Sequence, residues 1–282
     1  MAGFARGELQ QYDARLRAFL SYFGGISAQD MAFSKDGQWA VYVSFPEGTL
    51  WRSRADGSDK LQLTFPPLYA VNPRWSPDGK QIAFFSMQLP GEAAEVYLVS
   101  PDGGRPQKVM PNVPGPQVDP NWSPDGSALM FSGGGLGPTA IRIFNMSTHQ
   151  ITTLPNSQGL FSPRWSADGR YVVAITSPDM KSLMLFNFET GKWSLLFKAD
   201  ATVGQPLWSR DGRYVYYFLG YGAAAVMRVA IPSAKVEEVV SLTSFHSTGH
   251  WGLYFGLAPD DSPLVLKDTG TQDIVSLDFH EP

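Results

Sequence analysis

The sequence predicts an all-β fold, a β-propeller that most simply has six blades of four antiparallel strands with N-to-C ring closure. Three observations predict it. A short turn phrase recurs at intervals in the forties, strand-like segments flank each copy, and Gly (28) and Pro (22) residues are spread along the 282-residue chain. A period of this length with many short strands and turns is typical of propeller blades. We expect residues 1–282 to form a single propeller domain.

The recurring phrase reads aromatic-Ser-x-Asp-Gly. It starts at Phe33, Trp75, Trp122, Trp165 and Trp208, with a decayed copy at Leu257, and the spacings are 42, 47, 43, 43 and 49 residues. Ser and Asp side chains bond backbone N–H groups in tight turns, and Gly accepts the positive φ that closes them. Because one near-identical carboxylate occurs in almost every repeat, we interpret these Asp residues as structural. The alternative is that they are metal ligands or acids.

The second repeat shows the strand content of one blade. Asn72–Trp75 forms the first strand, Lys80–Phe85 the second, Glu95–Val99 the third and Gln107–Val109 the fourth. The second strands are nearly continuous apolar runs, which suit strands covered on both faces by neighbouring blades. The same order gives approximate repeats over 26–65, 68–111, 116–155, 158–199, 202–242 and 250–279.

The chain ends are expected to share a blade. The last repeat offers strands at Leu253–Leu257, Pro263–Leu266 and Ile274–Leu277 but no fourth strand, and the N-terminal region offers strands at Glu8–Tyr12 and Arg17–Tyr22. We expect residues 7–23 to close the last blade, because closure removes two exposed strand edges. One strand is then surplus, so a five-stranded last blade or a chain cut from a longer protein remain alternatives.

Composition excludes several classes of function. The net charge is −4 and no dense Lys/Arg cluster occurs, which argues against nucleic acid as the ligand of this region. The absence of Cys excludes disulfides, so the sequence does not indicate whether the protein resides in an oxidising or a reducing compartment. No apolar run is long enough for a membrane span, and the first 13 residues lack the apolar stretch of a signal peptide. The bacterial periplasm and the cytoplasm both stay open as locations.

The repeats resemble a known family. The pattern Pro-x-Trp-Ser-Pro-Asp-Gly-x-x-Ile-Ala-Phe, followed by a strand such as Val96–Val99, resembles the TolB-type propeller repeat, a WD-type repeat. Glu47–Arg54, Leu61–Pro67 and Gly256–Pro263 are similar to the C-terminal propellers of bacterial winged-helix regulators and related sensor-like proteins. In those proteins a DNA-binding domain, sometimes followed by a membrane span, precedes the propeller, and this chain contains neither. The resemblance implies a sensory or protein-binding module of a larger protein and implies no reaction.

A candidate binding site follows from the repeats. The position three residues before each anchor is polar in every repeat: Asp30, Asn72, Asp119, Ser162, Gln205 and Tyr254. We expect this ring, together with His250, to bind a protein segment or a small molecule at one channel mouth. The alternative is a solvated channel lining with ordered water. The loops at 87–94, 133–138 and 220–224 differ between repeats and are expected on the same face, where specificity would be set.

A metal site is the open alternative at this mouth. His246 and His250 lie in the loop before the last blade, and His250 could approach Asp30 or Asp119 across the channel. Such a set could hold a divalent metal or act as acid and base, whereas the alternative is a pair of surface loop histidines. We predict no cofactor and assign no catalytic residue, since no Gly-x-Ser-x-Gly or other nucleophile motif occurs.

Three functions are therefore weighed. The first is a non-enzymatic TolB-like binding module with a ligand or peptide at the channel mouth. The second is a propeller hydrolase or lyase that uses a metal held in the channel. The third is a purely structural segment of a larger regulator, which transmits a signal but binds nothing itself.

Overall fold

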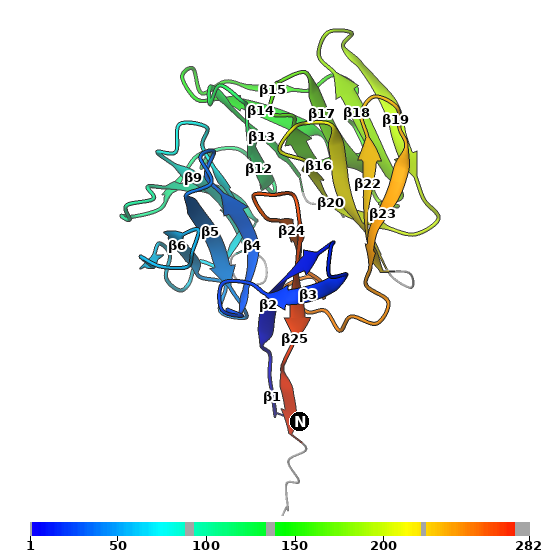
Figure 1. Cartoon of the computed structure of the whole chain (residues 1–282). Helices are drawn as coiled ribbons and strands as arrows, with labels where there is room; N and C mark the ends of the chain where they lie inside the picture. Colours follow the sequence, from blue (N-terminus) through cyan, green and yellow to red (C-terminus); the bar gives the residue numbers. More distant parts are fainter. Residues whose placement is uncertain (1, 88–92, 134–138, 221–223, 274–282) are drawn as a thin grey trace, which may run out of the picture.

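The computed structural model describes residues 2–87, 93–133, 139–220 and 224–273. In these ranges the chain forms 26 β-strands and no helix, and six of its sheets are four-stranded and antiparallel. Figure 1 shows these sheets arranged as the blades of a propeller. The prediction of an all-β, six-bladed propeller is confirmed. Across the described residues, no helix has the length and apolar character needed to cross a membrane.

Each of the first five blades is built from four consecutive strands. Blades 1 and 2 consist of β4 (Ala28–Phe33), β5 (Trp39–Ser44), β6 (Leu50–Arg54) and β7 (Leu61–Gln62), then β8 (Ala70–Trp75), β9 (Ile82–Ser86), β10 (Glu95–Val99) and β11 (Gln107–Lys108). Blade 3 consists of β12 (Val118–Trp122), β13 (Ala128–Ser132), β14 (Ile141–Asn145) and β15 (Ile151–Thr153). Blades 4 and 5 consist of β16 (Leu160–Trp165), β17 (Tyr171–Thr176), β18 (Ser182–Asn187) and β19 (Lys192–Lys198), then β20 (Val203–Trp208), β21 (Tyr214–Leu219), β22 (Ala225–Ala230) and β23 (Val236–Ser241).

Blade 6 is shared by the two ends of the chain. Its strand order is β24 (Phe255–Leu257), β25 (Pro263–Asp268), β2 (Gly7–Asp13) and β3 (Ala18–Ser21), with Gln10 opposite Val265. The predicted N-to-C closure is confirmed, but the third strand of this blade is β2 and not the segment 274–277, which lies outside the described residues. Beyond the blade, β1 (Ala2–Phe4) pairs with β26 (Thr271–Asp273) as a ribbon that leaves the ring (Figure 1).

Packing between blades explains the apolar second strands. All five residues of β9 are buried, and Ile82 and Phe84 pack against Val41 and Val43 of blade 1. Burying such a side chain contributes about 1.5–3 kcal/mol relative to exposure. Three of the four anchor tryptophans also bond across blades, as where the indole N–H of Trp122 donates to the carbonyl oxygen of Arg74 in blade 2, at 3.2 Å.

The turn after each innermost strand is a repeated hydrogen-bonded unit. In blade 3 the Ser123 hydroxyl donates to Asp125 at 2.6 Å and accepts the Ala128 N–H at 2.9 Å. Gly126 takes a φ of +74°. These bonds, with those from Ser127, lower the pKa of Asp125 to about 2. The repeated Asp residues therefore stabilise turns, as the structural interpretation expects.

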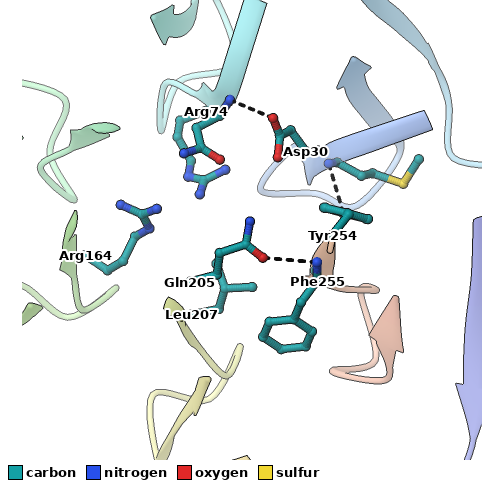
Figure 2. Close-up of a pocket in the computed structure, with 10 residues that line it drawn as sticks. Asp30, Arg74, Arg164, Gln205, Leu207, Tyr254 and Phe255 are labelled. Carbon is teal, nitrogen blue, oxygen red and sulfur yellow. Dashed lines mark hydrogen bonds between the residues drawn. The ribbon is translucent and has the colours of Figure 1, made fainter. Parts of the chain in front are cut away.

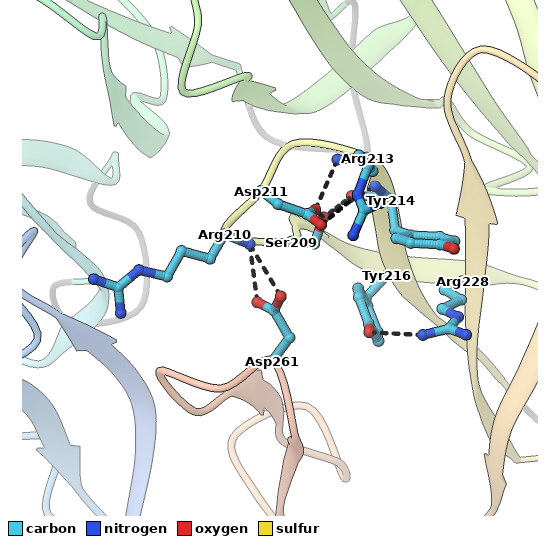
Figure 3. Close-up of polar contacts among 8 residues, drawn as sticks. All are labelled: Ser209, Arg210, Asp211, Arg213, Tyr214, Tyr216, Arg228 and Asp261. Atoms are coloured by element: carbon cyan, nitrogen blue, oxygen red, sulfur yellow. Dashed lines mark hydrogen bonds and ion pairs between the residues drawn. The ribbon is translucent and has the colours of Figure 1, made fainter.

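The decayed sixth copy of the phrase is still used. Asp261 stands where the other turns have Gly, and it accepts the same kind of backbone, with a φ of +64°. Its carboxylate accepts the backbone N–H of Arg210 in blade 5 at 2.9 Å (Figure 3). The Arg210 guanidinium in turn reaches the carbonyl oxygen of Lys35 in blade 1 at 3.4 Å. The turns of blades 5, 6 and 1 are thus linked to one another.

Candidate functional site

The innermost strand of each of the first five blades is interrupted at the predicted ring position. The pairing register shifts there in every one of these blades, as between Val71 and Arg74 in blade 2. The interrupting residues all have φ between +47° and +55°: Asp30, Asn72, Asp119, Ser162 and Gln205. Positive φ is uncommon for residues other than Gly, and a bulge of this kind re-aims a side chain. Tyr254 differs, since it precedes β24 and has no such φ.

Side chains of the ring connect successive blades around the channel. Asp30 accepts the backbone N–H of Asn72 at 3.2 Å, and the Asn72 amide donates to Asp119. On the other side, Gln205 accepts the N–H of Phe255 at 3.0 Å, as Figure 2 shows. The Tyr254 hydroxyl oxygen accepts the N–H of Met31 at 3.0 Å, which joins blade 6 to blade 1. Five of the six predicted side chains are therefore joined to neighbouring blades by hydrogen bonds, and the sixth, Ser162, is buried on β16 without being part of these bonds.

Two arginines that sequence reasoning did not select share this layer. Arg74 and Arg164 directly precede the anchor tryptophans of blades 2 and 4. Arg164 is 4% exposed and donates to Asp119 (8% exposed) at 3.4 Å. The signal was present in the sequence, because Pro-Arg-Trp-Ser occurs at both 73–76 and 163–166, where the other repeats carry uncharged residues.

These side chains enclose a small cavity in the channel. Its volume is about 20 Å³, and the residues that line it are Asp30, Met31, Asn72, Arg74, Arg164, Gln205, Leu207, Tyr254, Phe255 and Gly256. A water molecule needs about 10–15 Å³. Blades 1, 2 and 4 supply the charged wall, and blades 5 and 6 supply Leu207 and Phe255 (Figure 2). At this depth the channel accommodates a small group and not a bulky ligand.

Burial sets the electrostatics of the cavity. It raises the pKa of Asp30 to about 6, against the lowering effects of the Asn72 N–H and the Arg74 charge. Arg74 is partly exposed. Desolvation by the surrounding protein is the larger cause, and the positive charge of Arg164 the smaller one, that lower the pKa of Arg74 to about 10. Burial also raises the pKa of the Tyr254 hydroxyl. The site therefore combines two cations with a carboxyl group that titrates near neutral pH.

His250 does not join this cavity. Its backbone N–H donates to Gln29 at 2.7 Å, and its Nδ1 lies 3.1 Å from the Tyr69 hydroxyl. In the part of the chain that the structure describes, no three His, Asp or Glu side chains gather closely enough to hold a metal ion. The set of His250 with Asp30 and Asp119 that the sequence suggested is therefore not assembled. His250 instead lies beside Trp251, which is 58% exposed.

The variable loops expected at this mouth are only partly described. Residues 88–92, 134–138 and 221–223, which make up most of the three loops proposed to set specificity, lie outside the described residues. Tyr69 and His250 each lie in the loop that precedes an innermost strand, β8 and β24 respectively. They mark one mouth of the channel.

The protein has six blades, is closed by both chain ends and encloses a polar channel, so it is a six-bladed propeller. The family described as the TolB beta propeller domain matches residues 27–255, so the chain belongs to that family. The structure is similar to that of a putative TolB from Agrobacterium tumefaciens, with a TM-score of 0.72, 18% identity, and 94% of this chain and 99% of that chain covered.

Two further relatives carry enzyme names. An oligogalacturonate lyase in complex with manganese is similar with a TM-score of 0.58 and 14% identity, covering 93% of this chain and 79% of that chain. At such identity the likeness shows the fold alone. The uncharacterized peptidase YuxL of Bacillus subtilis (strain 168) is 29% identical over 92 residues, which is 30% of this chain and 14% of the peptidase. The match thus spans a small part of the length of that relative.

Proposed function

We propose that this protein is a non-enzymatic interaction module that holds a segment of another protein at the mouth marked by Tyr69 and His250. One observation carries the proposal. Five innermost strands share the same bulged backbone, yet the polar side chain at the bulge is of a different type in most blades. Left-handed backbone at residues other than Gly costs about 1–3 kcal/mol each. A constant scaffold with changing side chains is the arrangement expected of a surface that reads a ligand.

The mouth adds aromatic contact area to this layer. Trp251 is 58% exposed, its ring centroid lies 4.4 Å from that of His250, and His250 contacts Tyr69. Trp and Tyr are enriched where proteins bind one another, because each offers a large apolar surface with a polar tip. A bound segment would cover Trp251 and direct polar groups into the channel.

We further propose that the module is the sensory part of a larger bacterial protein. The likeness of Glu47–Arg54 and Leu61–Pro67 to propellers of winged-helix regulators supports this context. A hydrolase or lyase that uses a metal held in the channel is the second candidate function, and the local similarity to a peptidase leaves a hydrolase open. That candidate requires a divalent metal in the channel. It predicts that Ca²⁺, Mn²⁺ or Zn²⁺ raises the melting temperature of the EDTA-treated protein.

Selection from a phage-displayed random peptide library against the immobilised protein tests the proposed function. We expect enriched peptides whose affinity falls about tenfold or more, or about 1.4 kcal/mol, in Trp251→Ala. Leu195→Ala is the matched control, because Leu195 is 57% exposed on the outermost strand β19 of blade 4. Failure to enrich any peptide, or loss of binding in Leu195→Ala but not in Trp251→Ala, would contradict the proposal.

A further inference from the structure

The arginines of the channel cavity offer donors that the described residues do not use. Each guanidinium carries five N–H groups. In the described ranges, the Arg74 side chain donates to the carbonyl oxygen of Pro73 at 2.9 Å. Arg164 donates to Pro163 at 2.9 Å and to Asp119 at 3.4 Å, while its buried Nε has no protein partner there. Most of the N–H groups of the two guanidinium groups therefore have no hydrogen-bond partner among the described residues.

Other lining groups add donors, while Asp30 and Asn72 are the lining side chains that also bring acceptor oxygens. Gln205 spends its oxygen on Phe255, so its amide nitrogen is left, and Figure 2 shows this nitrogen directed into the space between Arg164 and Asp30. The Tyr254 oxygen accepts from Met31, which leaves its O–H. A buried donor without an acceptor costs about 1–3 kcal/mol. An occupant that only accepts would match this lining better than water, which brings two donors of its own.

The shape of the donors favours a carboxylate. Planar guanidinium groups bind carboxylate oxygens in pairs and make charge-assisted hydrogen bonds that are roughly twice as strong as neutral ones. A cavity of about 20 Å³ admits a small anion or the tip of an acidic group. Within the described part of the chain, Asp119 accepts from Asn72 and Arg164 through Oδ1 alone, and no bond from Arg74 reaches it.

We infer that the channel cavity is an anion-binding site, in which Arg74, Arg164 and the Gln205 amide hold a carboxylate. This inference deepens the proposed function and rests on it for the source of the anion, an acidic side chain or C-terminus of the bound segment. A free small anion such as acetate has the same chemistry, and the experiment separates the two sources.

Protonation of Asp30 would offset the negative charge that a bound anion adds to the site. Asp30 and Asp119 balance Arg74 and Arg164, so an added carboxylate gives the site a net charge of −1 unless Asp30 takes up a proton. Three charged groups act on Asp30: Arg74 on β8, Asp119 on β12 and Arg164 on β16. The Tyr254 hydroxyl, just before β24, also interacts with it. The pKa of Asp30, about 6, lets this proton bind close to neutral pH. Anion affinity should therefore rise as the pH falls from about 8 to about 5.5.

The first experiment uses bromide and acetate as probes on the purified protein. We expect an anomalous bromide peak between Arg74 and Arg164 in crystals, and a rise in melting temperature with either anion at constant ionic strength. Arg164→Lys keeps the positive charge beside Asp119 but loses the guanidinium, and it should weaken anion affinity about tenfold. The control is Arg228→Lys, whose pair with Glu237 (2.7 Å) lies on β22 and β23 away from the channel. A cavity that contains water alone, or an anion effect equal in both variants, overturns the inference.

The second experiment identifies the source. Peptides selected in the display experiment are compared with versions in which each carboxyl group is replaced by an amide. We expect one replacement to weaken binding about tenfold in wild type and far less in Arg164→Lys. If bromide binds but no peptide is enriched, the proposed function fails and the site is one for free anions. If peptides bind equally well as amides and no bromide peak occurs, the inference fails while the proposed function stands.

Discussion

The aspartates of the turns and the aspartates of the channel lie near opposite ends of the same innermost strands. They differ in exposure, in how often they recur and in the groups beside them. Turn residues such as Asp125 are exposed, recur in almost every blade and have their pKa lowered by hydrogen bonds. Asp30 and Asp119 occur in two blades, are buried, and lie beside arginines. Burial raises the pKa of Asp30 to about 6. A carboxylate that recurs in the repeats maintains the fold, and one that breaks the repeat is where a binding role should be sought.

The largest expected effect is the loss of stability when a buried channel aspartate is removed. Asp119→Ala should destabilise the protein by about 3–5 kcal/mol, because it leaves the buried Arg164 without its carboxylate and removes the acceptor of Asn72. Denaturant unfolding measures this loss. Asp119→Asn keeps an acceptor oxygen and should cost clearly less. A loss below about 1 kcal/mol in Asp119→Ala would show that the channel charges are not coupled to stability.

The second effect concerns pH. The pKa of Asp30 is raised to about 6, so the folded protein binds this proton more tightly than the unfolded chain does. The resulting stability is present below about pH 4 and is lost as the pH rises to about 6. Relative to Asp30→Asn, wild type should therefore lose about 2–3 kcal/mol across this range. Unfolding curves at stepped pH measure the difference. Parallel profiles for the two proteins would contradict the burial argument, which includes the opposing charges of Arg74 and Arg164.

Repetition also explains how much of the molecule the sequence could predict. The turns were located correctly, because their phrase recurs, and the same spacing picked out the positions at which the innermost strands of five blades bulge. Arg74 and Arg164 were not selected, since the bulge at Asn72 and Ser162 breaks the alternation from which the facing of a strand residue is inferred. The role of β2 as third strand of blade 6 depends on pairing with β25 from the other end of the chain. A local pattern does not encode such a partner.

The third effect is smaller and has the opposite pH dependence. Asp125→Ala removes an exposed carboxylate that accepts bonds from Ser123 and Ser127, and it should cost about 1 kcal/mol at neutral pH. Because the pKa of Asp125 is lowered to about 2, its contribution is present above about pH 4 and is lost as the pH falls toward 2. Unfolding of wild type and variant at both pH values measures this change. An equal difference at pH 7 and near pH 2 would contradict the assignment of Asp125 to the turn.

The smallest effect is expected at His250, which lies at the mouth and belongs neither to the turns nor to the channel cavity. Partial burial lowers the pKa of His250, so the folded protein resists its protonation. Stability from this residue is therefore present above about pH 6.5 and falls as the pH drops below that value, in the direction opposite to the Asp30 effect. His250→Asn should remove this dependence and, at pH 8, cost about 0.5–1 kcal/mol through loss of the bond to Tyr69. NMR titration of the histidine ring signals, with His250 assigned by its loss in the variant, measures the pKa directly. A value at or above about 6.5 would mean that the mouth is open to water at this position, and the contact of His250 with Tyr69 would then no longer support a preformed binding surface.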